Sequence, residues 1–310
     1  KGEGTMRDTF FKTLSELATQ NQSIEVVTGD LGFGVLKPFW EAHPDQIINA
    51  GIAEQNLTSV AAGMALEGKT VFTYSIGNFP TLRCLEQIRN DCAYHNADVK
   101  IICVGGGFVY GSLGMSHHAT EDIAVMRALP NVTVLCPGDL VEAEAVTKAI
   151  ANYPGTCYVR LGRGGEKKIH DSLSDFKIGK AISVKNGEKV AIFSTGAIFE
   201  EIAEACEILE KEGITPTVYT FPTVKPIDRD VINEVAQSHE LIITCEEHNL
   251  SGGFGSAVAE VLAELSTHAR LVKIGMNDEY STIVGDQKYL RHQYDMSGKK
   301  IAEKILHEVK

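Results

Sequence analysis

Residues 47–66, IINAGIAEQNLTSVAAGMAL, contain the strand-to-helix unit from which the fold of this chain can be predicted. The apolar start of the stretch predicts a buried strand that ends at Gly51, and helical spacing follows from Ala53. A strand that leads directly into a helix is typical of mainly parallel sheets covered by helices. Glu54 lies in the first turn of the predicted helix, where one interpretation is that its carboxylate complements the helix dipole.

The same alternation of short apolar runs and helical periods extends along the chain. In the first half it predicts strands at 24–28, 46–49, 70–75, 100–105, 132–135 and 157–161, and helices at 53–66, 81–94 and 140–151. In the second half it predicts strands at 190–194, 216–220, 241–246 and 271–274, and helices at 198–210, 228–236, 253–265 and 298–309.

A polar, strand-poor stretch at 162–175 separates the two halves. The 310 residues are too many for one compact core and suit two domains of ordinary size. We therefore predict an α/β protein with two doubly wound domains and mainly parallel sheets. The first domain would span residues 1–165, a linker 166–182, and the second domain 183–310.

Bulk properties exclude several classes of function. The net charge of −12 argues against nucleic acid or an anionic membrane as a partner. No apolar run approaches the roughly 18 residues that suggest a membrane span. The seven cysteines are odd in number, form no CxxC pair and lie mostly in apolar patterns. They are expected to be reduced core residues of a cytoplasmic protein.

The helix predicted after Glu54 is crowded with small residues. Ser59, Ala61, Ala62, Gly63 and Ala65 would let another helix approach closely. Such a face suits a buried subunit interface, so we expect the chain to associate with itself.

Several motifs, in order along nearly the whole chain, resemble one family of enzymes. These are GIAEQNLTSVAAGMALEGKTVFTYSIGNF (51–79), EQIRND (86–91), GMSHHATEDIAVMRALPNVTVLCPGD (114–139), YVRLGRG (158–164) and EEHNLSGGFGSAVAE (246–260). They resemble the pyrimidine-binding and C-terminal domains of thiamine-diphosphate enzymes of the transketolase kind. Deoxyxylulose-phosphate synthases and the β-chains of 2-oxoacid dehydrogenases share these domains.

The resemblance implies the residues that bind thiamine diphosphate. Glu54 matches the catalytic glutamate that shares a proton with the aminopyrimidine ring, and Phe79 matches the aromatic residue that stacks on that ring. Asp30 matches the aspartate at the thiazolium end, and Ile76 stands where the family has a further aromatic residue. Without the resemblance, Phe79 could be an ordinary core residue and Asp30 a turn residue.

The resemblance also implies the substrate end of the site. His117, in GMSHH, matches a catalytic histidine, and His118 replaces a glutamine. Arg163 matches an arginine that grips a substrate phosphate, and Arg7 matches a second one. An arginine fork suits phosphate, although a solvated surface role is the alternative for both. Leu113 stands where the family has an acidic residue for a donor hydroxyl.

The metal site of the family is missing from this sequence. Diphosphate-binding halves carry a GDG motif, but this chain has only GDL at 29–31 and at 138–140. Mg²⁺ or Ca²⁺ and its ligands are therefore expected in a diphosphate-binding partner subunit, with no metal ligand here. The resemblance is thus to the C-terminal subunit of a split transketolase, working within an α2β2 assembly.

Three departures from the family concern the donor. Gly105 and Gly34 fall where the family contacts a substrate phosphate, and Leu113 replaces the acid. We predict ketol transfer between a ketose and an aldose with a specialised sugar or sugar phosphate. The alternative is a 2-oxoacid dehydrogenase or deoxyxylulose-phosphate-synthase-like reaction. A non-catalytic chain is disfavoured because Glu54, Phe79 and His117 are all present. A nucleotide-binding protein is disfavoured because GGGFVYG (105–111) lacks GxGxxG spacing.

Overall fold

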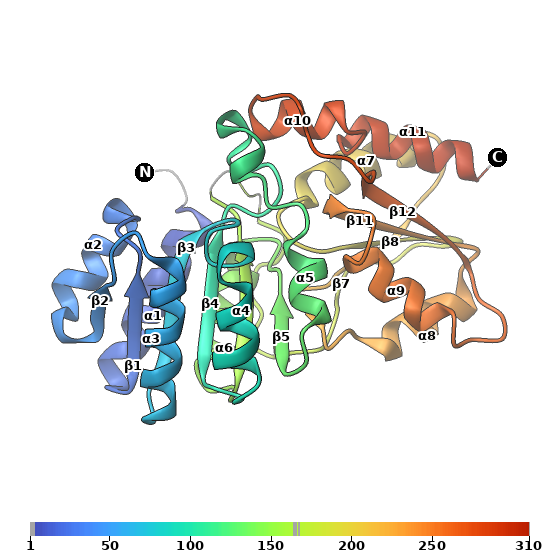
Figure 1. Ribbon diagram of the computed structural model, residues 1–310. Helices are drawn as coiled ribbons and strands as arrows, with labels where there is room; N and C mark the ends of the chain where they lie inside the picture. Colours follow the sequence, from blue (N-terminus) through green and yellow to red (C-terminus); the bar gives the residue numbers. More distant parts are fainter. Residues whose placement is uncertain (1–3, 164–165, 167, 310) are drawn as a thin grey trace.

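Two sheets of mainly parallel strands, each flanked by helices, make up the structure (Figure 1). It is a computed structural model that describes residues 4–163, 166 and 168–309. In this part of the chain the first sheet has seven strands in the order β10-β5-β6-β4-β3-β1-β2, and the second has five in the order β12-β11-β8-β9-β7. The predicted α/β class with two doubly wound, mainly parallel units is confirmed.

The strands of the first sheet are mostly apolar and buried, although β2 and β10 at its two edges are less fully buried. They are β1 (Ile24–Thr28), β2 (Ile47–Asn49), β3 (Thr70–Ile76), β4 (Val99–Val104), β5 (Val132–Leu135), β6 (Thr156–Leu161) and β10 (Thr223–Lys225). All of them pair in parallel except β10, which runs antiparallel to β5. Their carboxyl ends therefore share one edge of the sheet, where ligands bind in open α/β folds.

Helices cover both faces of this sheet. They are α1 (Met6–Gln20), α2 (Phe33–Ala42), α3 (Glu54–Leu66), α5 (Asp122–Ala128) and α6 (Leu140–Ile150). Three 3-10 turns, η1 (Pro44–Gln46), η4 (Gly111–Leu113) and η5 (Met115–His117), lie in the loops between them.

The single helix predicted over 81–94 is wrong in detail. A 3-10 turn, η2 (Leu82–Cys84), leads into α4 (Leu85–Gln87) and then into a π-helical segment, η3 (Ile88–Ala93). The amide of Tyr94 donates to the carbonyl of Arg89, five residues earlier, which is π spacing. Such widened turns shift the helical register, which a pattern of period 3.6 cannot indicate.

The second unit repeats the same architecture. Its strands are β7 (Ile182–Lys185), β8 (Val190–Ser194), β9 (Thr217–Thr220), β11 (Leu241–Asn249) and β12 (Arg270–Met276). Its helices are α7 (Phe199–Lys211), α8 (Arg229–Ser238), α9 (Phe254–Leu262), α10 (Gln287–Gln293) and α11 (Gly298–Glu308). Every residue of β11 is buried, and the strand lies between β12 and β8.

The two units share a core. One cluster of buried side chains includes Cys136 of the first unit together with Phe193 and Phe221 of the second. The strand β10 also crosses from the second unit to the edge of the first sheet, and the sequence pattern did not indicate it. The predicted boundary after residue 165 falls at residues 164, 165 and 167, which lie outside the described part of the chain.

Two expectations about the decisive stretch need correction. The strand β2 is at the edge of the sheet, and Ile48 is 42% exposed, so only Ile47 of this strand is buried. On α3, Ala61 and Ala62 pack into the chain's own core. The exposed small positions are Ser59 and Gly63, which leave a narrower close-approach face than the sequence suggested.

No helix in the described ranges is long and apolar enough to cross a membrane. All seven cysteines are buried and free, as their apolar surroundings predicted.

Candidate active site

The predicted site residues gather at the carboxyl edge of the first sheet. Asp30 follows β1, Glu54 follows β2 and begins α3, and Phe79 follows β3. His117 ends the turn η5 in the loop after β4, and Arg163 follows β6. The parallel topology therefore brings to one edge five side chains that are up to 133 positions apart in the sequence.

Glu54 is a buried carboxylate with one charged partner. Its side chain is 3% exposed, and its Oε2 accepts a hydrogen bond from Nη1 of Arg83 across 2.9 Å. The guanidinium carbon of Arg83 lies 4.6 Å from the centre of the Phe79 ring. Arg83 thus contacts both predicted pyrimidine-binding residues, and the sequence reasoning missed it.

This arrangement fits an aminopyrimidine ring. The guanidinium is planar and carries N–H donors, and it is bonded to the carboxylate of Glu54 while lying over the aromatic face of Phe79. A ring of the same planar, donor-bearing kind needs the same two partners, one acceptor and one stacking face. The pair Glu54 and Phe79 can therefore hold the pyrimidine part of the cofactor.

Asp30 and Asn49 form a rigid corner beside this pair. The amide nitrogen of Asp30 donates to Oδ1 of Asn49 across 3.0 Å, and Nδ2 of Asn49 donates back to Oδ1 of Asp30 across 2.9 Å. Asp30 has φ of 57°, a left-handed conformation that aspartate tolerates better than most residues. Ile76, at the end of β3, is half-buried and packs against the core on the α1 side of the sheet.

His117 lies next to the predicted stacking residue. Its ring centre is 5.2 Å from that of Phe79, in edge-on contact, and 6.4 Å from that of Tyr110. The hydroxyl of Ser116 is 3.1 Å from Nδ1 of His117, which leaves Nε2 for a ligand. The structure therefore brings His117 into the same group as Glu54.

Two arginines act on Tyr110, another residue that the sequence reasoning missed. The guanidinium carbon of Arg163 lies 4.9 Å from the centre of the Tyr110 ring. Burial raises the pKa of Tyr110, and the positive charges of Arg163 and Arg7 oppose that rise. The charges of Arg163 and Arg7 both act on the Tyr110 hydroxyl, so these two predicted phosphate-binding residues lie in the same corner of the site.

The ring of Tyr110 fills the space beside Gly105. Gly105 has φ of +96°, and a Cβ there would lie 2.3 Å from the Tyr110 ring. No residue with a Cβ fits at position 105 while the Tyr110 ring is in place. Tyr110 can therefore occupy this position at the substrate end only because residue 105 has no side chain.

The remaining predicted substrate residues differ in exposure. Leu113 is 55% exposed on the turn η4. His118 is buried, its ring centre lies 5.1 Å from that of Phe108, and its Nε2 is 3.2 Å from the carbonyl of Gly111. Leu113 is thus available to a ligand, whereas His118 packs beneath the loop.

A buried ionic network lies under this loop. The carboxylate of Asp122 accepts from Nε of Arg160 across 2.8 Å and from the hydroxyl of Tyr158 across 2.5 Å. Burial lowers the pKa of Arg160, but Asp122, Cys136, Tyr158 and Glu247 act together against this effect and raise the pKa above its ordinary value. Arg160 also donates to the carbonyl of Glu247, on β11, so the network joins the two units.

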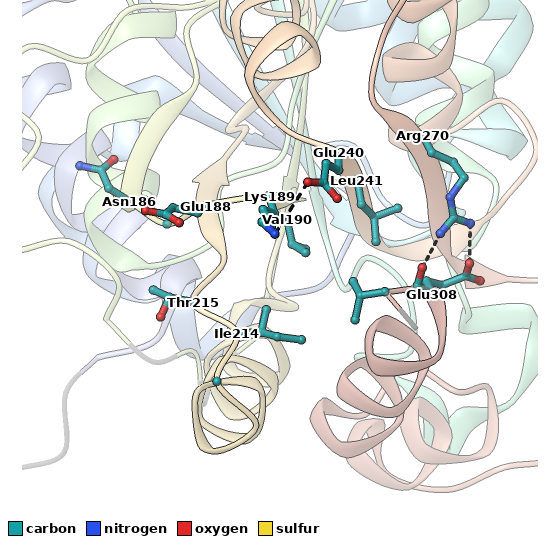
Figure 2. Close-up of a pocket in the computed structure, with 13 residues that line it drawn as sticks. Asn186, Glu188, Lys189, Val190, Ile214, Thr215, Glu240, Leu241, Arg270 and Glu308 are labelled. Atoms are coloured by element: carbon teal, nitrogen blue, oxygen red, sulfur yellow. Dashed lines mark hydrogen bonds and ion pairs between the residues drawn. The ribbon is translucent and has the colours of Figure 1, made fainter.

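Two pockets help to locate the site. One of about 1040 Å³ lies at the opposite, amino ends of the strands in the second sheet (Figure 2). Its cations are already paired, as Lys189 with Glu240 and Arg270 with Glu308. A smaller pocket of about 380 Å³ lies against α2 and includes Asn49, beside Asp30. Of the two pockets, the smaller one is therefore the one beside the predicted site residues.

Over residues 4–163, 166 and 168–309, no three His, Cys, Asp or Glu side chains form a group that could hold a metal ion.

Comparisons with known proteins identify the family of both units. Residues 3–165 match the family described as transketolase, pyrimidine binding domain, and residues 179–301 match transketolase, C-terminal domain. A protein of Methanocaldococcus jannaschii, named putative transketolase C-terminal section, is 37% identical and covers 98% of this chain and 96% of its own length. An apulose-4-phosphate transketolase subunit of Phocaeicola vulgatus is 35% identical, with 98% of this chain and 97% of that protein covered.

A solved structure described as split gene transketolase, inactive beta4 tetramer, has a TM-score of 0.88 at 35% identity and covers 99% of this chain and 98% of its own. The 1-deoxy-D-xylulose-5-phosphate synthase of Caldanaerobacter subterraneus subsp. tengcongensis is 31% identical, but this chain spans only 50% of that protein. Both units match transketolase domain families, and relatives that match over nearly their full length are named as transketolase sections or subunits. The chain therefore belongs to the thiamine-diphosphate-dependent transketolase family.

Proposed function

We propose that this chain is the pyrimidine-binding subunit of a split transketolase that moves a two-carbon ketol unit from a ketose to an aldose. The observation that carries the proposal is that Glu54 and Phe79 together bind the planar guanidinium of Arg83, which carries N–H donors. His117 lies beside Phe79. Relatives of nearly the same length are named as a section or a subunit of a transketolase.

Three residues have separate roles toward the cofactor. The Glu54 carboxylate holds and exchanges a proton at the pyrimidine ring, Phe79 orients that ring by stacking, and Asp30 lies toward the thiazolium end. Ile76 supplies an apolar wall. Thiamine diphosphate, when bound, supplies the electron sink that carbon–carbon cleavage next to a carbonyl requires. A buried, positioned carboxylate of this kind accelerates proton transfer by about 10²–10⁴-fold.

The substrate end combines one histidine with two cations. His117, with Nε2 available, can donate to or accept from the carbonyl and hydroxyl oxygens of the sugar. Arg163 and Arg7 provide charge for a phosphate or another anionic group on the substrate. Leu113 offers no partner to a donor hydroxyl, so the preferred donor is a specialised ketose. His118 supports the loop from beneath.

A separate subunit would supply the rest of the active site. The sequence lacks the GDG motif, so Mg²⁺ or Ca²⁺ with the diphosphate would be held by that partner. The exposed Ser59 and Gly63 of α3 would form the contact between two copies of this chain within an α2β2 heterotetramer. The buried, free cysteines suit a cytoplasmic enzyme.

A second candidate is a deoxyxylulose-phosphate-synthase-like reaction on the same cofactor. The match to such a synthase over the whole chain favours it, and a 2-oxoacid dehydrogenase subunit belongs to the same alternative. The two classes differ in the donor, because the synthase and the dehydrogenase consume a 2-oxo acid and release carbon dioxide. Product analysis with ketose and with pyruvate as donors separates them.

Calorimetric titration with thiamine diphosphate and magnesium chloride tests the split arrangement. The chain alone is expected to bind the cofactor weakly, and the complex with a diphosphate-binding subunit is expected to bind it tightly. A neighbouring gene whose product carries GDG is the first partner to try. Tight, magnesium-dependent binding by the chain alone would contradict the proposal.

A further inference from the structure

Residues 105–111 form the segment that shapes the substrate end of the site. This glycine-rich segment carries Tyr110, whose ring contacts Arg163 and approaches His117. It is tied to the loop that follows by a two-way backbone bridge, in which Gly107 and Ala119 exchange hydrogen bonds of 2.7 and 3.0 Å. In Figure 1 the green loops after β4 approach α10 of the C-terminal unit.

A carboxylate from that other unit binds the segment directly. Glu247 lies on β11 and is 4% exposed, and its Oε1 accepts from the amide of Phe108 across 2.5 Å. A Cβ at Gly107 would lie 2.4 Å from the same oxygen, and Gly107 has φ of +63°. The carboxylate therefore presses against the backbone where glycine alone leaves room.

Glu247 is itself fixed from behind. Its Oε2 accepts from Nε of Arg291 across 2.5 Å, and Nε2 of Gln287 is 3.0 Å from both oxygens. Arg291 is 1% exposed and also pairs with Glu200 across 2.8 Å. The ring of Phe108 is further held between His118 and Tyr294, with ring centres 5.1 and 5.4 Å away.

These contacts run from the C-terminal unit to the backbone beside Tyr110. We infer that Glu247 is a positioning residue for the substrate end of the site, acting through the amide of Phe108 on the segment that carries Tyr110. Glu247 has no hydrogen bond to Glu54 or Phe79, so its effect on the cofactor end is expected to be smaller than its effect on the substrate end. The kinetic consequence rests on the proposed function, whereas the structural consequence does not.

Hydrogen exchange followed by mass spectrometry tests the structural part on the full chain, alone and in its complex. Glu247→Ala strands the buried charge of Arg291 and can fail to fold, so Glu247→Ala/Arg291→Met is made beside it. Losing the acceptor of a buried amide predicts about 5- to 150-fold faster exchange in peptides spanning 104–119. Glu200→Ala, which cuts another ion pair of Arg291 and leaves the amide bonded, should leave these peptides unchanged.

Kinetics of the reconstituted enzyme test the positioning role. The double variant should raise the substrate KM at least about fivefold, with the Kd of thiamine diphosphate within about twofold of wild type. Unchanged exchange at 104–119, or equal changes of KM and cofactor Kd, would overturn the inference. If wild-type protein shows no ketol transfer, the proposed function fails, and the exchange result still decides whether Glu247 holds the segment.

Discussion

Nη1 of Arg83 lies 2.9 Å from Oε2 of Glu54, and the same guanidinium covers the ring of Phe79. In the proposed binding mode an aminopyrimidine ring uses both Glu54 and Phe79, so the ring would compete with Arg83 for the same position. The side chain of Arg83 is 47% exposed, which leaves it a route to turn toward solvent. Arg83 is therefore expected to move when the cofactor binds.

Arg83→Met should tighten cofactor binding, because a competing cation is removed while the length of the side chain is kept. A partly exposed ion pair contributes about 0.2–1 kcal/mol and an exposed cation–π contact about 0.5–1 kcal/mol. Together they predict a Kd for thiamine diphosphate roughly 3- to 30-fold lower, measured by calorimetry on the assembled enzyme. Arg89→Met, an exposed cation on the same helical segment, is the control. Weaker binding by Arg83→Met would instead identify Arg83 as an anchor for the cofactor.

Glu54→Gln should lower kcat by about 10²–10⁴-fold, because an amide keeps the shape but cannot exchange a proton. The free energy of unfolding should change little, because glutamine keeps the shape and Arg83, which is 47% exposed, can turn toward solvent. Steady-state kinetics and thermal unfolding of the reconstituted variant measure the two effects. Glu67→Gln, at the exposed end of the same helix, should change neither. Near wild-type turnover in Glu54→Gln would remove Glu54 from the catalytic role.

The sequence contains enough information for the core of the site but not for its rim. Glu54, Phe79 and Arg163 each follow a strand that its apolar run predicts, so parallel topology alone brings them to one edge. Arg83 lies four residues after Phe79, but Phe79 precedes the helix predicted over 81–94, so helical spacing could not have linked the two. Nothing in the local pattern indicates that Tyr110 folds back over Gly105.

The misassigned parts of the fold have similar causes. The strand β10 has only three residues, too few for a period to be detected, and it is fixed by pairing with β5. The strand β2 is apolar but lies at an edge, because burial depends on neighbours that a sequence window does not contain. Glu247 and Arg291 are charged yet buried, since each is the other's partner across 44 residues of sequence.

Cysteine reactivity offers a test of burial. Burial raises the pKa of Cys206 to about 11 and that of Cys92 to about 12. For Cys157 burial outweighs the opposing effect of Lys100 and raises the pKa to about 11. At pH 8 a pKa of 11 leaves a thiolate fraction of about 10⁻³, and only the thiolate attacks a disulfide reagent. A colorimetric disulfide reagent should therefore react slowly with native protein at pH 8.

Unfolding in urea returns the thiols to an ordinary pKa of about 8.5, so all seven should then react rapidly. Raising the pH of the native protein should accelerate the reaction, because the thiolate fraction grows toward the raised pKa values. A native thiol that reacts on mixing at pH 8 would contradict the burial described here.

The last prediction concerns the donor. Leu113 is exposed on the turn η4, so a carboxylate can replace it without cost to the core. An unpaired sugar hydroxyl costs about 1–3 kcal/mol on burial, and Leu113→Asp supplies the missing acceptor. Activity of the reconstituted variant toward xylulose 5-phosphate and fructose 6-phosphate should rise about 5- to 150-fold in kcat/KM, while the native donor is impaired. Met115→Asp, equally exposed two residues away, adds the same charge and should not reproduce the gain. A wild-type enzyme that already uses both donors as efficiently as an ordinary transketolase would contradict the prediction of a specialised donor.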